Sequence, residues 1–343
     1  MKALVTGSAG FIAGYLVEEL LSAGHEVVGI DNFSKYGKVE KSYQNHPGYH
    51  FIEGDAKDTK LLTELTMPCD HFVACAARIG GISYFHEYAY DLLAENERII
   101  ASSFDAAITA FKKGKLKKVT VLSSSMVFEN ATIFPTPEGH QAECAAPLST
   151  YGFQKLACEY FAKGAWEQYK LPYTICRPFN CVGIGERRAL GDVDVPSGNI
   201  SLAMSHVVPD LAQKIIKGQS PLHILGSGEQ VRCYTYGGDL AKGIVACIFH
   251  PAALNEDFNL STPVATSVLE LAKLTWGKIH GTGRGAPPFQ YVSDTAYLYD
   301  VQKRVPDVSK AKQILGYEAN TSLSTMLDEV ISWIRQEIVH GRV

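Results

Sequence analysis

The stretch Met1–Asp31, MKALVTGSAGFIAGYLVEELLSAGHEVVGID, predicts one strand–helix–strand unit that decides the fold. Residues 3–5 form the short apolar run of a strand buried on both faces. Apolar residues then recur at helical spacing over 12–21, and Gly24 ends the helix. Residues 27–30 form a second buried strand, which leads directly into an aspartate. The unit therefore predicts a parallel sheet from the first residues onward.

A glycine turn joins the first strand to the helix, with the spacing Gly7-x-x-Gly10-x-x-Ala13. Glycines let the backbone approach a pyrophosphate, and the free N–H groups and dipole of the helix N-terminus attract it. An acid that closes the second strand accepts hydrogen bonds from the adenosine ribose and repels a 2′-phosphate, which favours NAD over NADP. This context predicts dinucleotide binding rather than an idle turn. The expected NAD contacts here are Gly7, Gly10, Phe11, Ile12, Asp31 and Asn32.

Bulk composition restricts the class of protein. A chain of 343 residues with 46% hydrophobic and 20% charged residues predicts one large domain or two closely joined domains. A formal charge of −4 predicts no affinity for nucleic acid, and no apolar run is long enough for a membrane span. The first strand leaves no room for a signal peptide. Eight cysteines without a C-x-x-C pair predict free thiols in the cytoplasm and no bound metal.

Further strands are expected at 49–53, 71–75 and 118–122, with helices between them. This alternation predicts the α/β class, as a Rossmann-type doubly wound parallel sheet. The loop 32–48 either lies beside the adenosine or is plain surface. Asp55 either reaches the adenine amino group or caps a helix that begins near Lys57. Small residues after the fourth strand again permit close backbone approach. The remaining expected NAD contacts are Asp55, Ala56, Cys75, Ala76, Ala77, Asn96 and Pro178.

Two polar motifs are placed for chemistry. Ser123-Ser124-Ser125 follows the fifth strand, at the sheet edge where ligands bind in such folds. A long helix then opens with Tyr151 and Lys155, which share a face because they are four residues apart. A lysine ammonium stabilises the phenolate form of a neighbouring tyrosine, and such a tyrosine can take a proton from a sugar hydroxyl while hydride leaves for NAD.

Taken together and in this order, these motifs resemble the extended short-chain dehydrogenase/reductases, in the nucleotide-sugar epimerase/dehydratase branch. Three later segments support the resemblance: 177–183 (RPFNCVG), 226–234 (GSGEQVRCY) and 304–311 (RVPDVSKA). The resemblance implies that Ser124 and Tyr151 bracket the sugar C4 hydroxyl, and that Lys155 tunes Tyr151 and holds the nicotinamide ribose.

Ser124 is favoured among its neighbours because the catalytic hydroxyl of this family lies three residues before the Val of a Val-Tyr-Gly motif. That motif reads Val127-Phe128-Glu129 in this chain, which departs at two positions and leaves Ser123 or Ser125 open.

The position two after the catalytic serine separates the reactions of the family. It is usually Glu in 4,6-dehydratases and the related decarboxylases, and Cys in GDP-mannose 3,5-epimerases. In this chain it is Met126, which cannot move a proton, and Ser125 replaces the dehydratase Asp. The resemblance therefore implies a 4-epimerase, or alternatively a 4-dehydrogenase or 4-reductase. Segment 77–82 resembles GDP-fucose synthase and GDP-mannose 3,5-epimerase, which keeps open a GDP-sugar substrate and a reductase or deoxysugar role. A regulatory NAD-sensing protein is the third reading.

Beyond Asn180 the strict alternation of strands and helices is lost. The expected NAD-binding domain spans 1–180 with a return segment at about 231–262, and a smaller mixed α/β domain for the nucleotide sugar spans 181–230 and 263–343. Loop 183–199 is expected to act as a lid, followed by a helix over 202–217 and a strand over 222–225. By resemblance, the expected substrate contacts are Arg78, Ser125, Met126, Asn180, His206, Arg232 and Arg304.

Guanidinium groups suit a diphosphate, although Arg304 could also form a surface ion pair. The resemblance also implies a homodimer in which helices near 92–113 and 151–169 of two copies form a four-helix bundle.

Overall fold

The computed structural model describes residues 1–80, 87–186, 206–297 and 300–342. Its centre is a seven-stranded sheet in the order β11-β6-β5-β4-β1-β2-β3, and every neighbouring pair is parallel. This is the doubly wound order, and the Rossmann-type prediction is confirmed. The strands are β1 (Lys2–Thr6), β2 (Glu26–Asp31), β3 (Tyr49–Glu53), β4 (His71–Ala74), β5 (Lys118–Leu122), β6 (Tyr173–Pro178) and β11 (Glu256–Leu260).

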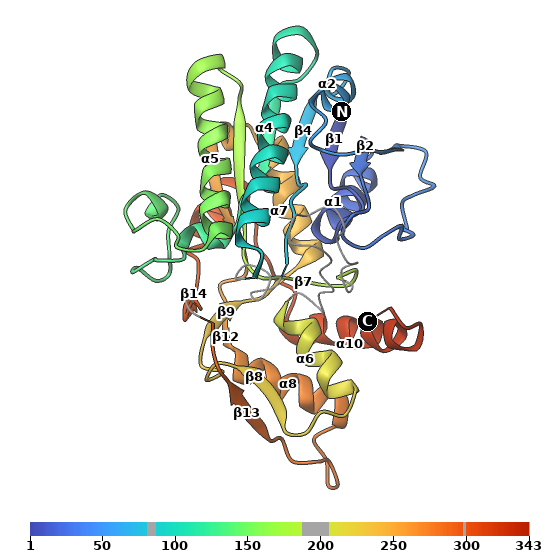
Figure 1. Ribbon diagram of the computed structural model, residues 1–343, viewed down its shortest axis with the longest axis vertical. Helices are drawn as coiled ribbons and strands as arrows, with labels where there is room; N and C mark the ends of the chain where they lie inside the picture. The colour runs from blue at the N-terminus through green and yellow to red at the C-terminus, as the bar shows by residue number, and fades with distance from the viewer. Residues whose placement is uncertain (81–86, 187–205, 298–299, 343) are drawn as a thin grey trace.

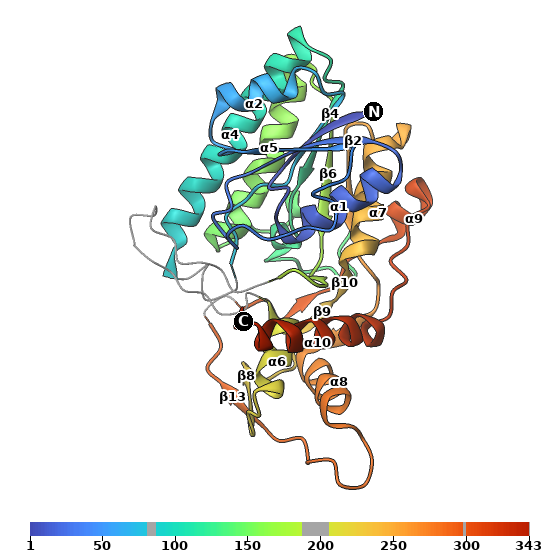
Figure 2. The same cartoon turned by 90° about the vertical axis from the view of Figure 1, so that its right-hand side faces the viewer.

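Helices cover both faces of the sheet (Figure 2). One face carries α1 (Phe11–Ser22), α7 (Gly237–Phe249) and α9 (Ser309–Leu315), and the other carries α2 (Thr59–Thr66), α4 (Ala89–Lys113) and α5 (Thr150–Tyr169). A separate hydrophobic cluster fills each interface. Because the central strands are buried on both faces, they require the continuous apolar runs seen in the sequence.

A smaller group of elements forms the lower part of the molecule in Figure 1. It contains α6 (Val207–Ile216), α8 (Val268–His280), α10 (Leu323–Val339) and the parallel pair β8 (Leu222–Leu225) and β13 (Tyr291–Asp294). These helices share their own apolar core, which includes Leu211, Trp276 and Leu327. One apolar face of α10 contributes Met326, Leu327, Val330, Ile331 and Ile334 to this core.

Short strands link the two groups of elements. β9 (Val231–Cys233) pairs with β12 (Ala265–Ser267) and β14 (Lys303–Arg304), and β7 (Cys181–Val182) pairs with β10 (Thr235–Tyr236). Three 3-10 helices complete the described elements: η1 (Ser125–Phe128), η2 (His140–Ala142) and η3 (Pro251–Ala253). The domain boundaries expected from the sequence stay a prediction.

One local expectation was wrong, and one of the two alternatives for Asp55 is excluded. α6 begins at Val207, so His206 is its extended N-cap with φ −119 and ψ 158, and not a helical residue. Pro209 explains this start, since proline suits a first turn whose N–H groups have no intrahelical partner. Asp55 caps no helix, because α2 starts at Thr59 and its N-cap is Asp58. The expected lid lies largely outside the described residues.

Several further properties concern the described residues only. No helix in the described ranges is long and apolar enough to cross a membrane. Nowhere in the same ranges do three or more His, Cys, Asp or Glu side chains gather in a way that would hold a metal ion. All eight cysteines are free thiols.

Candidate active site

A cavity of about 680 Å³ follows the carboxyl ends of the central strands and continues into the smaller group of elements. Ligands of doubly wound sheets bind at this edge, where the strand order reverses between β1 and β4. The predicted NAD contacts that line it are Gly7, Gly10, Phe11, Ile12, Asp31, Asn32, Asp55, Ala56, Cys75, Ala76, Ala77, Tyr151, Lys155 and Pro178. The other predicted site residues that line it are Arg78, Ser124, Ser125, Met126, Asn180, His206, Arg232 and Arg304.

The glycine turn forms a cradle that side chains would fill. Gly7 has φ +69, and a Cβ there would lie 3.0 Å from the Cα of Ala76. A Cβ on Gly10 would lie 2.9 Å from the main-chain oxygen of Gly7. No side chain caps α1 at Gly10, and the first residues of this helix line the cavity, where the free N–H groups of a helix N-terminus can bind a ligand. This geometry fits a dinucleotide pyrophosphate.

Asp31 lies at the end of β2 with a fixed carboxylate. Its oxygens accept hydrogen bonds from the backbone N–H groups of Ala9 at 3.1 Å and Phe33 at 2.7 Å. Burial raises the pKa of Asp31, and these two N–H groups and the ammonium of Lys41 oppose that rise. The carboxylate therefore ties the glycine turn to the loop after β2 and presents an acceptor to the cavity, as an adenosine ribose requires.

Asp55 forms a tight turn beside Asp31. Its carboxylate accepts hydrogen bonds from the backbone N–H of Lys57 at 2.8 Å and from the side-chain amide of Asn32 at 3.4 Å. It lines the cavity next to β2, which is the adenosine end expected from the sequence.

The loop after β2 contacts the glycine turn, an outcome that the sequence left open. The hydroxyl of Tyr43 donates to the carbonyl of Ser8 at 2.6 Å, and the ammonium of Lys41 donates to the carbonyl of Gly10 at 3.1 Å. Ser34, Lys35 and Tyr36 of the same loop line the cavity. The many Lys and Tyr residues in the sequence of this loop were the feature that could have indicated these contacts.

Asn96 supports the site from behind. Its side-chain amide accepts the N–H of Arg78 at 2.7 Å and donates to the carbonyl of Arg78 at 2.8 Å. Thr6 accepts the N–H groups of Cys75 and Ala76, each at 3.1 Å. Asn96 was predicted to contact NAD, but it is not among the residues that line the cavity. Its contacts instead hold the small-residue segment against the glycine turn.

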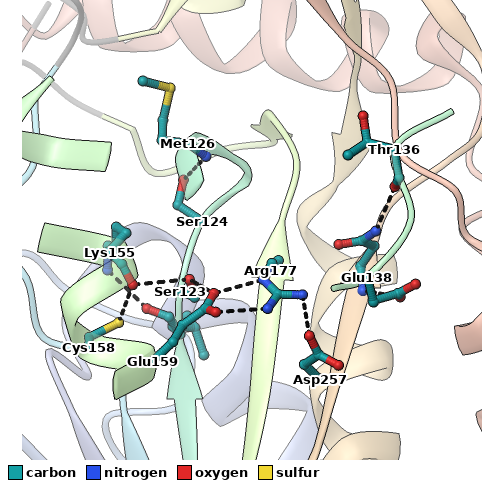
Figure 3. Close-up of polar contacts among 12 residues, drawn as sticks. Ser123, Ser124, Met126, Thr136, Glu138, Lys155, Cys158, Glu159, Arg177 and Asp257 are labelled. Atoms are coloured by element: carbon teal, nitrogen blue, oxygen red, sulfur yellow. Dashed lines mark hydrogen bonds and ion pairs between the residues drawn. The ribbon is translucent and has the colours of Figure 1, made fainter. Parts of the chain in front are cut away.

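Three consecutive residues at the end of β5 have different partners (Figure 3). The carbonyl of Leu122 accepts the Nζ of Lys155 at 2.9 Å. The hydroxyl of Ser123 donates to the carboxylate of Glu159 at 2.6 Å, so it faces α5. Both serines line the cavity, but the Oγ of Ser124 is not committed to α5 and accepts the N–H of Met126 at 3.2 Å. This alternation favours Ser124 over Ser123 as the catalytic hydroxyl.

Tyr151 lies in the first turn of α5, one helical turn before Lys155. The N-cap Ser149 accepts the N–H of Gly152 at 3.0 Å. Tyr151 is 5% exposed and belongs to a small apolar cluster with Met126. The position that carries Glu in dehydratases and decarboxylases therefore holds a buried thioether next to the tyrosine.

A buried ion network stands directly behind the serine run (Figure 3). Arg177 pairs with both oxygens of Glu159 at 2.7 and 2.8 Å and with Asp257 at 2.6 Å. Although burial opposes it, the charges of Arg177 and Lys310 lower the pKa of Asp257 to about 2. The network joins β5, β6, β11 and α5. Sequence reasoning missed the role of Glu159, although its spacing of four from Lys155 places it on the same helical face.

Two guanidinium groups, those of Arg232 and Arg304, also line the cavity. Arg232 is buried and pairs with Asp300 at 3.3 Å. The buried Nε of Arg304 has no hydrogen-bond partner among the described residues. Burial and the charge of Arg232 lower the pKa of Arg304, which shows how unfavourable two neighbouring cations are in this place. An anion such as a diphosphate would relieve this repulsion.

Asn180 and His206 line the cavity with their side chains already engaged. The amide of Asn180 donates to the carbonyl of Cys233 at 3.2 Å, which ties the end of β6 to β9. The imidazole of His206 contacts the buried carboxylate of Glu186. Nothing in the sequence indicated the latter pairing.

Residues 3–261 match the NAD dependent epimerase/dehydratase family. An uncharacterized UDP-glucose epimerase of Bacillus subtilis (strain 168) is 29% identical, over 97% of this chain and 98% of its own. A UDP-N-acetyl-alpha-D-glucosaminuronate decarboxylase of Bacillus cytotoxicus is 28% identical over 98% of each chain. The crystal structure of UDP-glucuronic acid 4-epimerase from Bacillus cereus, in complex with UDP-glucuronic acid and NAD, is similar at a TM-score of 0.80. It is 25% identical and covers 98% of this chain and 99% of its own.

The chain therefore belongs to the NAD dependent epimerase/dehydratase family, and its cofactor is NAD. The family contains epimerases, dehydratases and decarboxylases that act on nucleotide sugars.

Proposed function

We propose that the protein is a UDP-sugar 4-epimerase. The observation that carries this proposal is the composition of one cavity wall, where Ser124, Tyr151 and Lys155 come together and Met126 stands in the place of a second acid or base. Such a wall can oxidise and reduce one carbon, and at the described position where dehydratases and decarboxylases carry Glu it offers no acid or base.

The reaction divides between cofactor and protein. The glycine turn and Asp31 would hold NAD, which would supply the hydride acceptor and donor for C4 of the sugar. Tyr151, as phenolate, takes the proton of the C4 hydroxyl, and the Oγ of Ser124 hydrogen-bonds the same oxygen. Lys155 supplies the positive charge that favours the phenolate. After the 4-keto sugar has rotated in the site and hydride has returned to its opposite face, Tyr151 returns the proton to the C4 oxygen. No net oxidation of the sugar remains.

Arg232 and Arg304 are proposed to hold the diphosphate. The unpartnered Nε of Arg304 and the like charges of the two groups support this role. The proposal of UDP rather than GDP rests on the UDP-sugars in the names of the similar proteins.

The test is a panel of nucleotide sugars that includes UDP-glucose, UDP-galactose, UDP-glucuronic acid and a GDP-hexose. Product stereochemistry is followed by NMR, and reduced nicotinamide by its absorbance. Formation of the C4 epimer without accumulated NADH supports the proposal. Stoichiometric NADH without an epimer would instead identify a 4-dehydrogenase, or a 4-reductase in the reverse direction. If the protein binds NAD but converts none of these nucleotide sugars, the result would favour a regulatory protein that senses NAD.

We also propose a homodimer built on α4 and α5, which lie side by side (Figure 1). Large apolar side chains on these helices are exposed, with Tyr90 at 72%, Phe153 at 49% and Tyr160 at 63%. Monomers of Tyr160→Glu in size-exclusion chromatography with light scattering, against dimers of the unaltered protein, would support this interface. The expected cytoplasmic location stays a prediction.

A further inference from the structure

Glu129 connects the two segments that carry the proposed catalytic hydroxyls. Ser124 is the N-cap of η1 and Glu129 is its C-cap. From there the Oε1 of Glu129 accepts the backbone N–H groups of Leu148 at 3.0 Å and Ser149 at 3.1 Å. Its Oε2 also contacts the hydroxyl of Ser149. Ser149 caps α5, so Glu129 holds the residue that begins the helix of Tyr151.

The contact between η1 and α5 is as close as backbone permits. A Cβ on Gly152 would lie 2.8 Å from the carbonyl oxygen of Met126, 3.0 Å from Oε2 of Glu129 and 2.6 Å from Cβ of Pro147. Only glycine fits at this point of the helix. Gly152 allows η1 and α5 to approach each other because it has no side chain. The carboxylate of Glu129 supplies hydrogen bonds that hold the two elements together.

The carboxylate suits this place energetically. Bonds from N–H groups to a carboxylate are stronger than neutral ones, and negative charge at a helix N-terminus is favoured by the helix dipole. Glu129 does not line the cavity, so it has no route to a substrate proton. Glu129 also occupies the position that is Gly in the Val-Tyr-Gly motif. A glycine at this position would have no side chain to make these bonds.

We propose that Glu129 is a positioning residue that sets the separation between the Ser124 hydroxyl and the Tyr151 phenol by clamping η1 to the start of α5. The inference rests on the proposed function, in which both hydroxyls address one sugar oxygen. A misplacement of such groups by about 1 Å costs on the order of 100-fold in rate. Loss of the clamp should therefore act on kcat and leave the contacts of NAD with the glycine turn intact.

The experiment compares Glu129→Ala, Glu129→Gln and Ser149→Ala with the matched control Glu138→Gln. Glu138 is an acid of the same connecting loop that accepts a backbone N–H, from Asn259 at 2.8 Å, but it does not contact α5. We expect kcat of Glu129→Ala to fall about 10- to 100-fold with KM and bound NAD within about twofold of the unaltered protein. Glu129→Gln retains one acceptor oxygen, so its kcat should lie between those of Glu129→Ala and the unaltered protein. The kcat of Glu138→Gln should equal that of the unaltered protein.

A merely structural role would lower the melting temperature and leave kcat per folded molecule unchanged. Unchanged kcat in Glu129→Ala, or a change in KM alone, would overturn the proposal.

Hydrogen exchange separates this claim from the proposed function. In Glu129→Ala the amides of Leu148 and Ser149 should lose protection, whether or not a substrate is known. Full protection there would overturn the clamp. Lost protection in a protein that turns over no nucleotide sugar would support the clamp while the proposed reaction fails.

Discussion

The Nζ of Lys155 donates a hydrogen bond of 2.9 Å to the carbonyl of Leu122, the last residue of β5. The lysine that accompanies Tyr151 is therefore fixed to the end of the same strand that leads into Ser124. Strand and helix place the hydroxyl, the phenol and the ammonium along one wall of the cavity. The relationship makes the proposed chemistry a property of the rigid sheet rather than of a loop.

Tyr151→Phe should lower turnover about 10²- to 10⁴-fold, because it removes the proposed acid–base group without emptying the space. NAD binding should remain nearly unchanged, since the glycine turn and Asp31 are untouched. Steady-state rates and the content of bound NAD measure the two effects. Tyr160→Phe, on the exposed face of the same helix, is the matched control. Full activity in Tyr151→Phe would refute the assigned role.

Arg304→Gln should raise KM for the nucleotide sugar and the Kd for UDP about 10- to 100-fold. The estimate follows from the loss of a hydrogen bond to a charged group, which contributes about 1.5–3 kcal/mol. NAD affinity should change little. Calorimetric titration with UDP and with NAD distinguishes the two ligands, and unchanged UDP affinity would remove Arg304 from the diphosphate site.

Asp31→Asn should weaken NAD binding about tenfold and reduce the preference of the protein for NAD over NADP. The substitution keeps the size of the side chain but removes the charge that repels a 2′-phosphate. The ratio of the two dissociation constants, measured on protein freed of cofactor, is the readout. A ratio equal to that of the unaltered protein would mean that Asp31 only supports the turn through Ala9 and Phe33.

His71 should make stability depend on pH. Burial, and then the charge of Lys118, lower the pKa of His71 to about 3, so the folded protein keeps the imidazole neutral. An unfolded histidine binds a proton near pH 6.5, and stability therefore falls as pH drops below that value. Between pH 7.5 and 5.5 this loss is about 1.4 kcal/mol.

Urea unfolding measures the free energy of unfolding at the two pH values. Its change between them should be smaller in His71→Gln than in the unaltered protein by that amount. The exposed His50→Gln is the control and should keep the full dependence. Equal pH dependence in His71→Gln and the unaltered protein would contradict the assignment.

Much of the architecture follows from local patterns in the sequence. The buried runs of β1, β2 and β5 are short and apolar, and the glycine turn and the pair Tyr151 and Lys155 are spaced by the geometry of one helix end or one helix face. These features need no knowledge of distant residues. The position of Ser124 was predicted by resemblance, and the structure adds a physical reason, because Ser123 is turned toward Glu159.

What could not be predicted depends on pairs far apart in the chain. Asp257 reaches Arg177, and Asp300 reaches Arg232, only after β11 and β14 have joined their sheets. Asn96 was predicted to contact NAD, whereas its side-chain amide forms two hydrogen bonds with the backbone of Arg78. Long-range hydrogen bonds of this kind leave no periodic pattern in the sequence.

The most direct test of the central claim uses UDP-glucose that carries deuterium at C4 of the sugar. The account predicts that the C4 epimer forms with the deuterium retained at C4, with no exchange into solvent and no released reduced cofactor, because the hydride returns from the same bound NAD. Mass spectrometry and NMR of the product measure this. Deuterium lost to solvent or to released cofactor, or an epimer formed at another carbon, would contradict the account.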